Sequence, residues 1–126
     1  MKATLTNYRQ SPQKTRLVAN LIRGKSVHDA MTALSFLPKK SSPAFKKLLD
    51  SAVSNARGMG VSAGALFVKT ISVDKGLVIR RFKPMARGRA AGIRRTRSII
   101  SLELGTIVAK PAKQMKKKEV AVAVSK

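Results

Sequence analysis

The chain has 126 residues, with 27 Lys and Arg against 5 Asp and Glu, which gives a formal net charge of +22. Because it has no cysteine, it can form neither disulfides nor thiolate zinc sites, which suits a reducing compartment such as the cytoplasm. No run approaches the roughly eighteen apolar residues of a membrane span, and the N-terminus lacks the apolar centre of a secretory signal. We therefore expect a cytoplasmic domain whose partner is a polyanion and not a membrane.

Two helices are predicted between residues 11 and 38 from their terminal signals. The first begins at Ser11-Pro12, a cap residue followed by a proline at the first helical position, and ends before Gly24. Its predicted buried face holds Leu17, Val18, Leu21 and Ile22. The second begins at Ser26, with Asp29 in its first turn, and ends at Pro38. Its predicted buried face holds Val27, Ala30, Met31, Leu34 and Leu37.

A third helix and a strand follow in the chain. Ser42-Pro43 repeats the cap signal, and Gly58 with Gly60 predicts the end of this helix. Its predicted buried face holds Phe45, Leu48, Leu49, Ala52, Val53 and Ala56. Over residues 66–73 the apolar period changes to 2, which predicts a strand, and we expect the run 3–8 to pair beside it. One face of the strand would hold Phe67, Lys69, Ile71 and Val73, and the other Leu66, Val68, Thr70 and Ser72.

Residues 75–102 form the most basic segment, with nine Lys and Arg and no carboxylate. Runs 77–82 and 93–104 both alternate as strands, and turn residues such as Pro84 and Gly88 lie between them, which predicts a β-hairpin. At roughly 3.3 Å per residue, the path from Asp74 to Gly88 could extend about 45 Å. A 100-residue domain has a radius of gyration of only about 13 Å, so the hairpin should project from its own domain.

The distal half of this hairpin cannot pack on a protein core without burying unpaired charge. A solvated basic tail would have no need of Val78, Phe82 and Ile93 at strand spacing. Arginine dominates over lysine there, as is typical of bidentate contact with phosphate or stacking on bases. We therefore predict that a nucleic acid surrounds the hairpin. Its candidate phosphate contacts are Arg80, Arg81, Lys83, Arg87, Arg89, Arg94, Arg95 and Arg97.

Three short motifs along the chain resemble those of a known family. Residues 9–18, closing with 21–25, are similar to the opening helix of the uL22 family of large-subunit ribosomal proteins. Residues 51–56 resemble part of its third helix, and residues 83–90 resemble the tip of its hairpin. The likeness covers residues 3–104 and keeps the order of the motifs. It implies an α+β fold, with three helices packed on a small three-stranded antiparallel sheet and a long protruding β-hairpin.

The resemblance also implies a function and a set of partners. The protein would be a structural constituent of the large ribosomal subunit that binds large-subunit rRNA, as a monomer within the ribosome. Its single globular domain, residues 1–104, would include the hairpin, about 75–102. The body would lie near the exit-tunnel mouth, and the tip of the hairpin would line the nascent-polypeptide tunnel. Neighbouring ribosomal proteins, including uL4 at the tunnel constriction, and the nascent polypeptide would be its other partners. Residues 105–126 would form a flexible basic tail.

Specific residues follow from this resemblance. The tunnel-lining tip would consist of Met85, Ala86, Arg87, Gly88, Arg89 and Ala90. The RNA-binding set adds to the eight hairpin cations Arg9, Lys14, Arg16, Arg23 and Lys25. No cofactor and no metal are expected.

Two other classes of protein remain as alternatives. An enzyme is poorly supported, because His28, the single histidine, sits beside Asp29 at a helix start, where a surface or capping role is the simpler interpretation. The carboxylates are scattered singly, which argues against a metal cluster or a paired-carboxylate site. An architectural DNA-binding protein with a basic β-arm is the second alternative, with Pro84 as its wedge. The motif over residues 11–25 favours the ribosomal interpretation.

Overall fold

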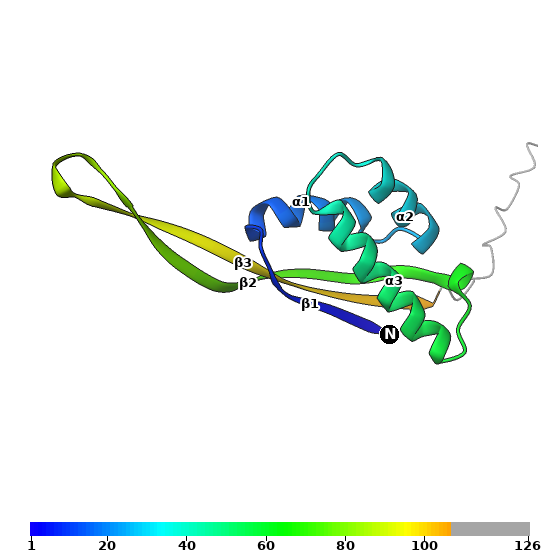
Figure 1. Cartoon of the computed structure of the whole chain (residues 1–126). Helices are drawn as coiled ribbons and strands as arrows, with labels where there is room; N and C mark the ends of the chain where they lie inside the picture. The colour runs from blue at the N-terminus through cyan, green and yellow to red at the C-terminus, as the bar shows by residue number, and fades with distance from the viewer. Residues whose placement is uncertain (107–126) are drawn as a thin grey trace, which may run out of the picture.

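The computed structural model describes residues 1–106. Three helices lie on one face of a three-stranded sheet, and the two longest strands continue out of this body as a hairpin (Figure 1). The elements are β1 (Lys2–Tyr8), α1 (Pro12–Ile22), α2 (Val27–Phe36), α3 (Ser42–Gly58), β2 (Leu66–Pro84) and β3 (Ala90–Thr106). The expected α+β fold is confirmed. Of the expected tail, Gly105 and Thr106 belong to β3, and residues 107–126 lie outside the described part.

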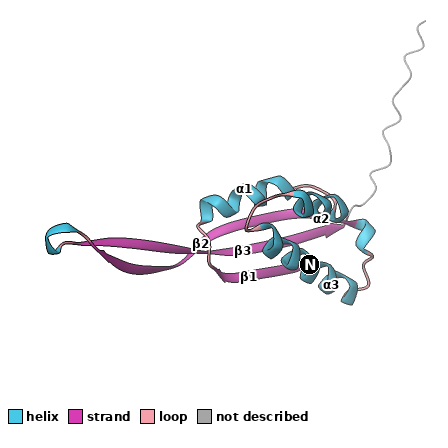
Figure 2. Ribbon diagram, turned by 45° about the horizontal axis from the view of Figure 1, so that its top comes forward, coloured by secondary structure: helices cyan, strands magenta, loops and turns pink. Residues whose placement is uncertain are grey.

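The sheet is antiparallel in the order β1-β3-β2, so β3 is its central strand (Figure 2). The expectation that the N-terminal run pairs beside residues 66–73 is therefore wrong, because β1 pairs with β3. The physical reason is that the outer edge of β2 is already occupied. The Gly24 amide donates to the Val68 carbonyl at 3.0 Å, and the Val68 amide donates to the Lys25 carbonyl at 2.9 Å.

A β-bulge changes the phase of β2. The register steps from Val68 opposite Leu104 to Thr70 opposite Glu103, which leaves Lys69 as the extra residue. As a consequence Leu66 and Val68 are buried on the same side as Ile71 and Val73. The predicted assignment of the two faces of this strand is wrong, since strict alternation fails at the bulge.

The buried face of α1 differs from the predicted one. Val18 and Ile22 are buried as expected, but Leu17 is 66% exposed and Leu21 is 37% exposed. Thr15 and Ala19 take their places in the core. The Thr15 hydroxyl donates to the Ser11 carbonyl at 2.9 Å, so its burial leaves no unsatisfied polar group.

The orientation of α1 is fixed by two arginines. The Arg16 guanidinium donates to the Val73 carbonyl from Nε at 3.2 Å and from Nη2 at 3.1 Å. Arg23 donates to the Ile71 carbonyl at 3.0 Å. Both acceptors belong to β2, so these bonds hold the arginine side of α1 against the outer edge of the sheet. The leucines at 17 and 21 consequently turn outward.

The other two helices follow the sequence closely. All six apolar positions predicted for α3 are buried. In α2, Val27, Ala30 and Leu34 are buried, while Met31 and Leu37 are partly buried and pack against the core. The β3 side of this core consists of Ile100, Leu102 and Leu104. Within residues 1–106, none of the helices has the length and apolar character of a membrane span.

The hairpin is longer and its loop shorter than predicted. The two runs expected as separate strands, 66–73 and 77–82, are parts of one strand that extends to Pro84, opposite Ala90. After the shift at the Lys69 bulge, the register shifts a second time between Lys75 and Val78. We call the paired segments beyond this shift, with their connecting tip, the arm. It projects well beyond the helices (Figure 1).

Candidate nucleic-acid interface

A basic groove lies where the arm leaves the body. We call it the junction groove; it has a volume of about 670 Å³. Its lining comes from the turn after β1, the start of α1, the loop before α3, and both arm strands. The lining residues are Arg9, Gln10, Ser11, Lys14, Lys40, Ile79, Arg81, Arg94, Arg95, Thr96 and Arg97. Seven of these eleven side chains are cationic and none is a carboxylate.

Local bonds hold the body side of the groove in place. Asn7 adopts the left-handed conformation, with φ of 61°, and its side-chain oxygen accepts a hydrogen bond from Arg97. The Ser98 hydroxyl donates to the Gln10 carbonyl at 2.6 Å, which ties the turn after β1 to β3. The Tyr8 hydroxyl donates to the Lys40 carbonyl at 3.4 Å. Partial burial raises the pKa of Tyr8, so this phenol stays protonated and remains a donor.

The cations of the groove and arm lack acidic partners. In residues 1–106 the ion pairs are Lys2 with Glu103 and, when the histidine is charged, His28 with Asp29. Neither pair belongs to the junction groove or the arm. Clustered cations without counter-charges repel one another and create a strongly positive potential, which is the property expected of a polyanion-binding surface.

The arm carries the same charge along both strands. Arg80 lies directly opposite Arg94, while Arg81 lies opposite Ile93. Beyond the junction groove a smaller groove of about 260 Å³ follows the arm, and we call it the arm groove. Its lining residues are Arg80, Arg81, Phe82, Gly92, Ile93 and Arg94.

The tip is a tight turn that exposes all six predicted residues, 85–90. The Met85 amide donates to the Arg89 carbonyl at 2.7 Å, which closes the turn. Arg87 and Gly88 both have positive φ, 59° and 66°. For a non-glycine residue this backbone region is unfavourable, and Arg87 therefore presents its guanidinium from a strained turn.

The structure groups the predicted RNA-binding residues in three places. Six of them line the junction groove: Arg9, Lys14, Arg81, Arg94, Arg95 and Arg97. Arg80 lines the arm groove, and Lys83, Arg87 and Arg89 lie farther out on the arm. Arg16 and Arg23 bond to the edge of β2, and Lys25 follows them there, so these three lie apart from the groove. Lys40 was missed, although the Lys39-Lys40 pair in the loop before α3 was a signal for it.

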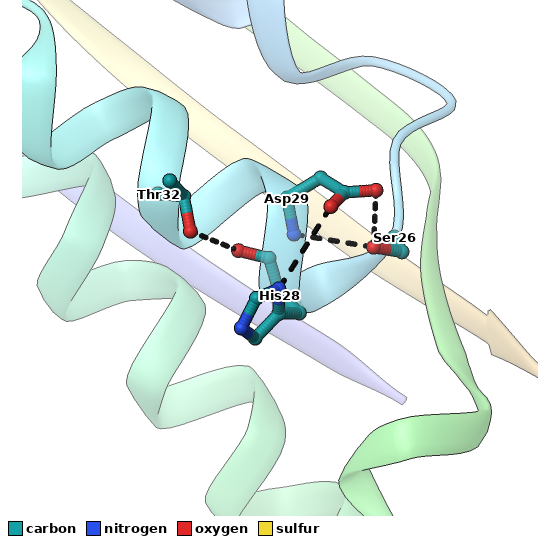
Figure 3. Close-up of polar contacts among 4 residues, drawn as sticks. All are labelled: Ser26, His28, Asp29 and Thr32. Carbon is teal, nitrogen blue, oxygen red and sulfur yellow. Dashed lines mark hydrogen bonds and ion pairs between the residues drawn. The ribbon is translucent and has the colours of Figure 1, made fainter.

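Ser26 and Asp29 form the N-terminal cap of α2, and His28 lies beside them (Figure 3). The Ser26 Oγ accepts from the Asp29 amide at 3.1 Å and donates to Asp29 Oδ2 at 2.8 Å. His28 Nδ1 is 3.8 Å from Asp29 Oδ1, and its side chain is 92% exposed. Because the hydroxyl proton goes to the carboxylate and not to the imidazole, this is no nucleophile–base pair. His28 is therefore a surface residue beside the cap, as one of the two expected roles had it. Residues 1–106 contain no group of three or more potential metal ligands.

Comparisons with known proteins agree with this architecture. The family model described as Ribosomal protein L22p/L17e matches residues 3–105. The large ribosomal subunit protein uL22 of Pelobacter propionicus is 53% identical over 103 residues, covering 81% of this chain and 93% of the relative. For uL22 of Trichlorobacter lovleyi the identity is 52% over 103 residues, with coverages of 81% and 91%. For uL22 of Bdellovibrio bacteriovorus it is 48% over 105 residues, with coverages of 82% and 96%.

The basic body, its projecting arm and these matches together define a ribosomal protein, which is a structural constituent of the ribosome and not an enzyme. Such a protein is ribosome-bound in the cytoplasm. The chain belongs to the Ribosomal protein L22p/L17e family, to which the uL22 proteins belong. The resemblance seen in the three motifs is thereby confirmed.

Proposed function

We propose that the protein binds large-subunit rRNA through the junction groove and the arm, as a monomer within the ribosome. The observation that carries this proposal is the groove of seven cations without a carboxylate, at the point where a rigid body meets an extended ribbon. Phosphates are the ligands that such a surface selects, and guanidinium groups bind them in a bidentate manner. The body fixes the register of the RNA, and the arm passes into it.

Binding and ordering of the arm are coupled. A two-stranded ribbon is marginally stable in water, and the like charges on this one lower its stability further. Phosphates that replace the counterions of Arg80, Arg94 and their neighbours remove that repulsion. The arm becomes fully ordered only inside its RNA site.

Salt dependence tests this proposal quantitatively. If about eight phosphates are neutralised, the logarithm of the association constant should fall against the logarithm of salt concentration with a slope of about −6 to −7. The measurement is a filter-binding titration with large-subunit rRNA between about 50 and 200 mM salt. A slope shallower than about −2 would contradict the proposal.

A charge-reversal pair tests which surface binds. Arg80→Glu with Arg81→Glu should weaken rRNA binding strongly while the helical circular dichroism of the body stays unchanged. The matched control is Lys46→Glu with Lys47→Glu, two adjacent exposed lysines of α3 that lie outside the junction groove. An equal loss in the control would show that net charge, and not the arm, determines binding.

We also propose that the body lies near the mouth of the exit tunnel, with the tip, residues 85–90, lining the nascent-polypeptide tunnel near uL4. The exposed tip at the end of a long arm and the family membership support this placement. Because the chain has no cysteine, Ala86→Cys creates a single attachment site for a photocrosslinker. In ribosomes with a stalled nascent chain, it should crosslink to that chain and to uL4, whereas Ser54→Cys on α3 should not. Failure of the tip to reach either partner would exclude the placement.

A further inference from the structure

Phe82 is an aromatic side chain on the arm that lies mostly in solvent. It is 75% exposed, and its directly opposite partner is Gly92. A Cβ atom added at Gly92 would meet no atom within 4 Å, so the space across the strand from Phe82 is open. A phenylalanine in water gains none of the free energy that burial would supply, so a partner that covers the ring would recover it.

The surroundings of Phe82 indicate the chemistry of that partner. The ring lines the arm groove together with Arg80, Arg81 and Arg94. Arg80 is two residues away on the same face of β2, at roughly 6.6–6.8 Å along the strand. An exposed aromatic ring beside guanidinium groups is the arrangement that single-stranded nucleic acid binds, with a base on the ring and phosphates on the cations.

A protein partner fits this groove less well. An apolar side chain placed over Phe82 would cover the three neighbouring guanidinium groups as well. Cations that lose water without gaining a counter-charge are costly. A nucleotide can cover the aromatic ring and also supply a counter-charge to the guanidinium groups, because its base is apolar on its faces and its phosphates are negative.

We propose that Phe82 stacks on an unpaired RNA base, while Arg80 and Arg94, which lie opposite each other on the same face of the arm, hold the backbone phosphate next to that nucleotide. This inference rests on the proposed rRNA binding and adds to it a site for one splayed nucleotide on the arm. The absence of a side chain at Gly92 leaves the room through which the base approaches the ring. Duplex RNA cannot occupy the site, since its bases are already stacked and paired.

A tryptophan at this position reports stacking directly. The chain contains no Trp, so Phe82→Trp introduces a single fluorophore. With full-length large-subunit rRNA its emission should be quenched by at least half, because stacking on a base quenches indole. The matched control is Leu77→Trp, at a 66% exposed position on the same strand outside the arm groove, and it should change little. Equal quenching of the two variants would overturn the proposal.

Affinity provides the second readout. Phe82→Leu keeps an apolar side chain but removes the aromatic face, and it should weaken rRNA binding about 5- to 150-fold. Phe82→Tyr should bind within about twofold of the natural protein. The salt slope should not change in either variant, because stacking releases no counterions. If Phe82→Leu binds as tightly as Phe82→Tyr, no base is stacked on the ring.

The outcomes separate this inference from the proposed function. If the natural protein binds rRNA with a steep salt slope but Phe82→Leu has no effect, the stacking site is wrong and the rRNA binding stands. If the natural protein does not bind rRNA, both fail. An emission of Phe82→Trp that shifts to the blue only when uL4 is added would assign the ring to a protein contact and would overturn the stacking site.

Discussion

Arg80 and Arg94 lie directly opposite each other across the arm, on the same face of the ribbon and without a carboxylate partner. Like charges in directly opposed positions destabilise a pair of strands. The free protein thus carries an unfavourable contact in the outer part of its longest strand, and phosphate is the ligand that would relieve it.

Arg94→Glu should therefore have opposite effects on the free arm and on RNA binding. It replaces a repulsive pair by an ion pair with Arg80, worth about 0.2–1 kcal/mol in a sheet. Amide hydrogen exchange of residues 78–96 should slow in the free protein, while rRNA affinity falls and the salt slope becomes shallower by about 1. Arg94→Gln, which only removes the repulsion, should give intermediate exchange. Faster exchange in Arg94→Glu than in the natural protein would contradict this account.

Arg16 should contribute to the stability of the fold as well as to the positive charge of the protein. Its two bonds to the Val73 carbonyl hold α1 on the edge of β2, so Arg16→Met should lower the free energy of unfolding by about 1 kcal/mol. Lys14→Met removes the same charge from an exposed position of the same helix and should change it by less than about 0.5 kcal/mol. Urea denaturation of both variants measures the difference. Equal unfolding midpoints would mean that the guanidinium bonds are not stabilising.

The exposure of Leu17 leads to a second prediction about stability. Leu17→Ala should lower the free energy of unfolding by no more than about 0.5 kcal/mol, because the side chain is already in water. Ile22→Ala removes a similar number of atoms from a fully buried site and should cost about 2–5 kcal/mol. Thermal or urea unfolding distinguishes them. A large loss of unfolding free energy in Leu17→Ala would show that Leu17 is buried, as the sequence predicted.

The Lys2–Glu103 pair should make the β1–β3 contact sensitive to acid. Lys2 Nζ lies 2.7 Å from Glu103 Oε1, and this hydrogen bond, with the charge of Lys2, lowers the pKa of Glu103 and raises the pKa of Lys2. The carboxylate thus contributes stability above about pH 4.3, its ordinary pKa, and loses it as the pH falls through its lower folded value. The lysine contributes below its ordinary pKa of about 10.4 and loses this as the pH rises through its higher folded value.

Glu103→Gln should accordingly remove part of the loss of stability on acidification. The measurement is the free energy of unfolding as a function of pH at low salt, for the natural protein and the variant. Both side chains are solvent-accessible, so the effect is small and screened by salt. If the two curves stay parallel below about pH 4.3, the pair does not stabilise the sheet.

Local periodicity predicted the helices better than the sheet. The buried residues of α3 were all found because its apolar stripe faces one uninterrupted core. In α1 the apolar stripe predicted the wrong buried face. The helix is held by hydrogen bonds from Arg16 and Arg23 to carbonyls of β2, which are distant in the sequence and leave no sign in a local pattern. The phase of β2 depends on a bulge at Lys69, and nothing in the alternation of residues 66–73 marks it.

The charge of the basic surface could be predicted from the sequence, but the residues that meet in the junction groove could not. Arginines separated by more than 70 residues, such as Arg9 and Arg95, meet in the junction groove because β1 returns along β3. A sequence with β1 beside β2 would not have brought them together. Lys40 joins them because the loop before α3 reaches Tyr8, whose hydroxyl donates to the Lys40 carbonyl.

The outer edge of β2 is covered in the body, whereas the strand edges of the arm are not. Within the body, Arg16, Arg23 and the Gly24–Lys25 backbone cover that edge, so it offers no template for another chain. Along the arm both strands have one uncovered edge, and bare strands of this length are where protein chains begin to aggregate. The arginines oppose such aggregation, because the positive charges on the arms of two newly made copies repel each other and prevent edge-to-edge strand pairing. The arm therefore stays available for its binding site.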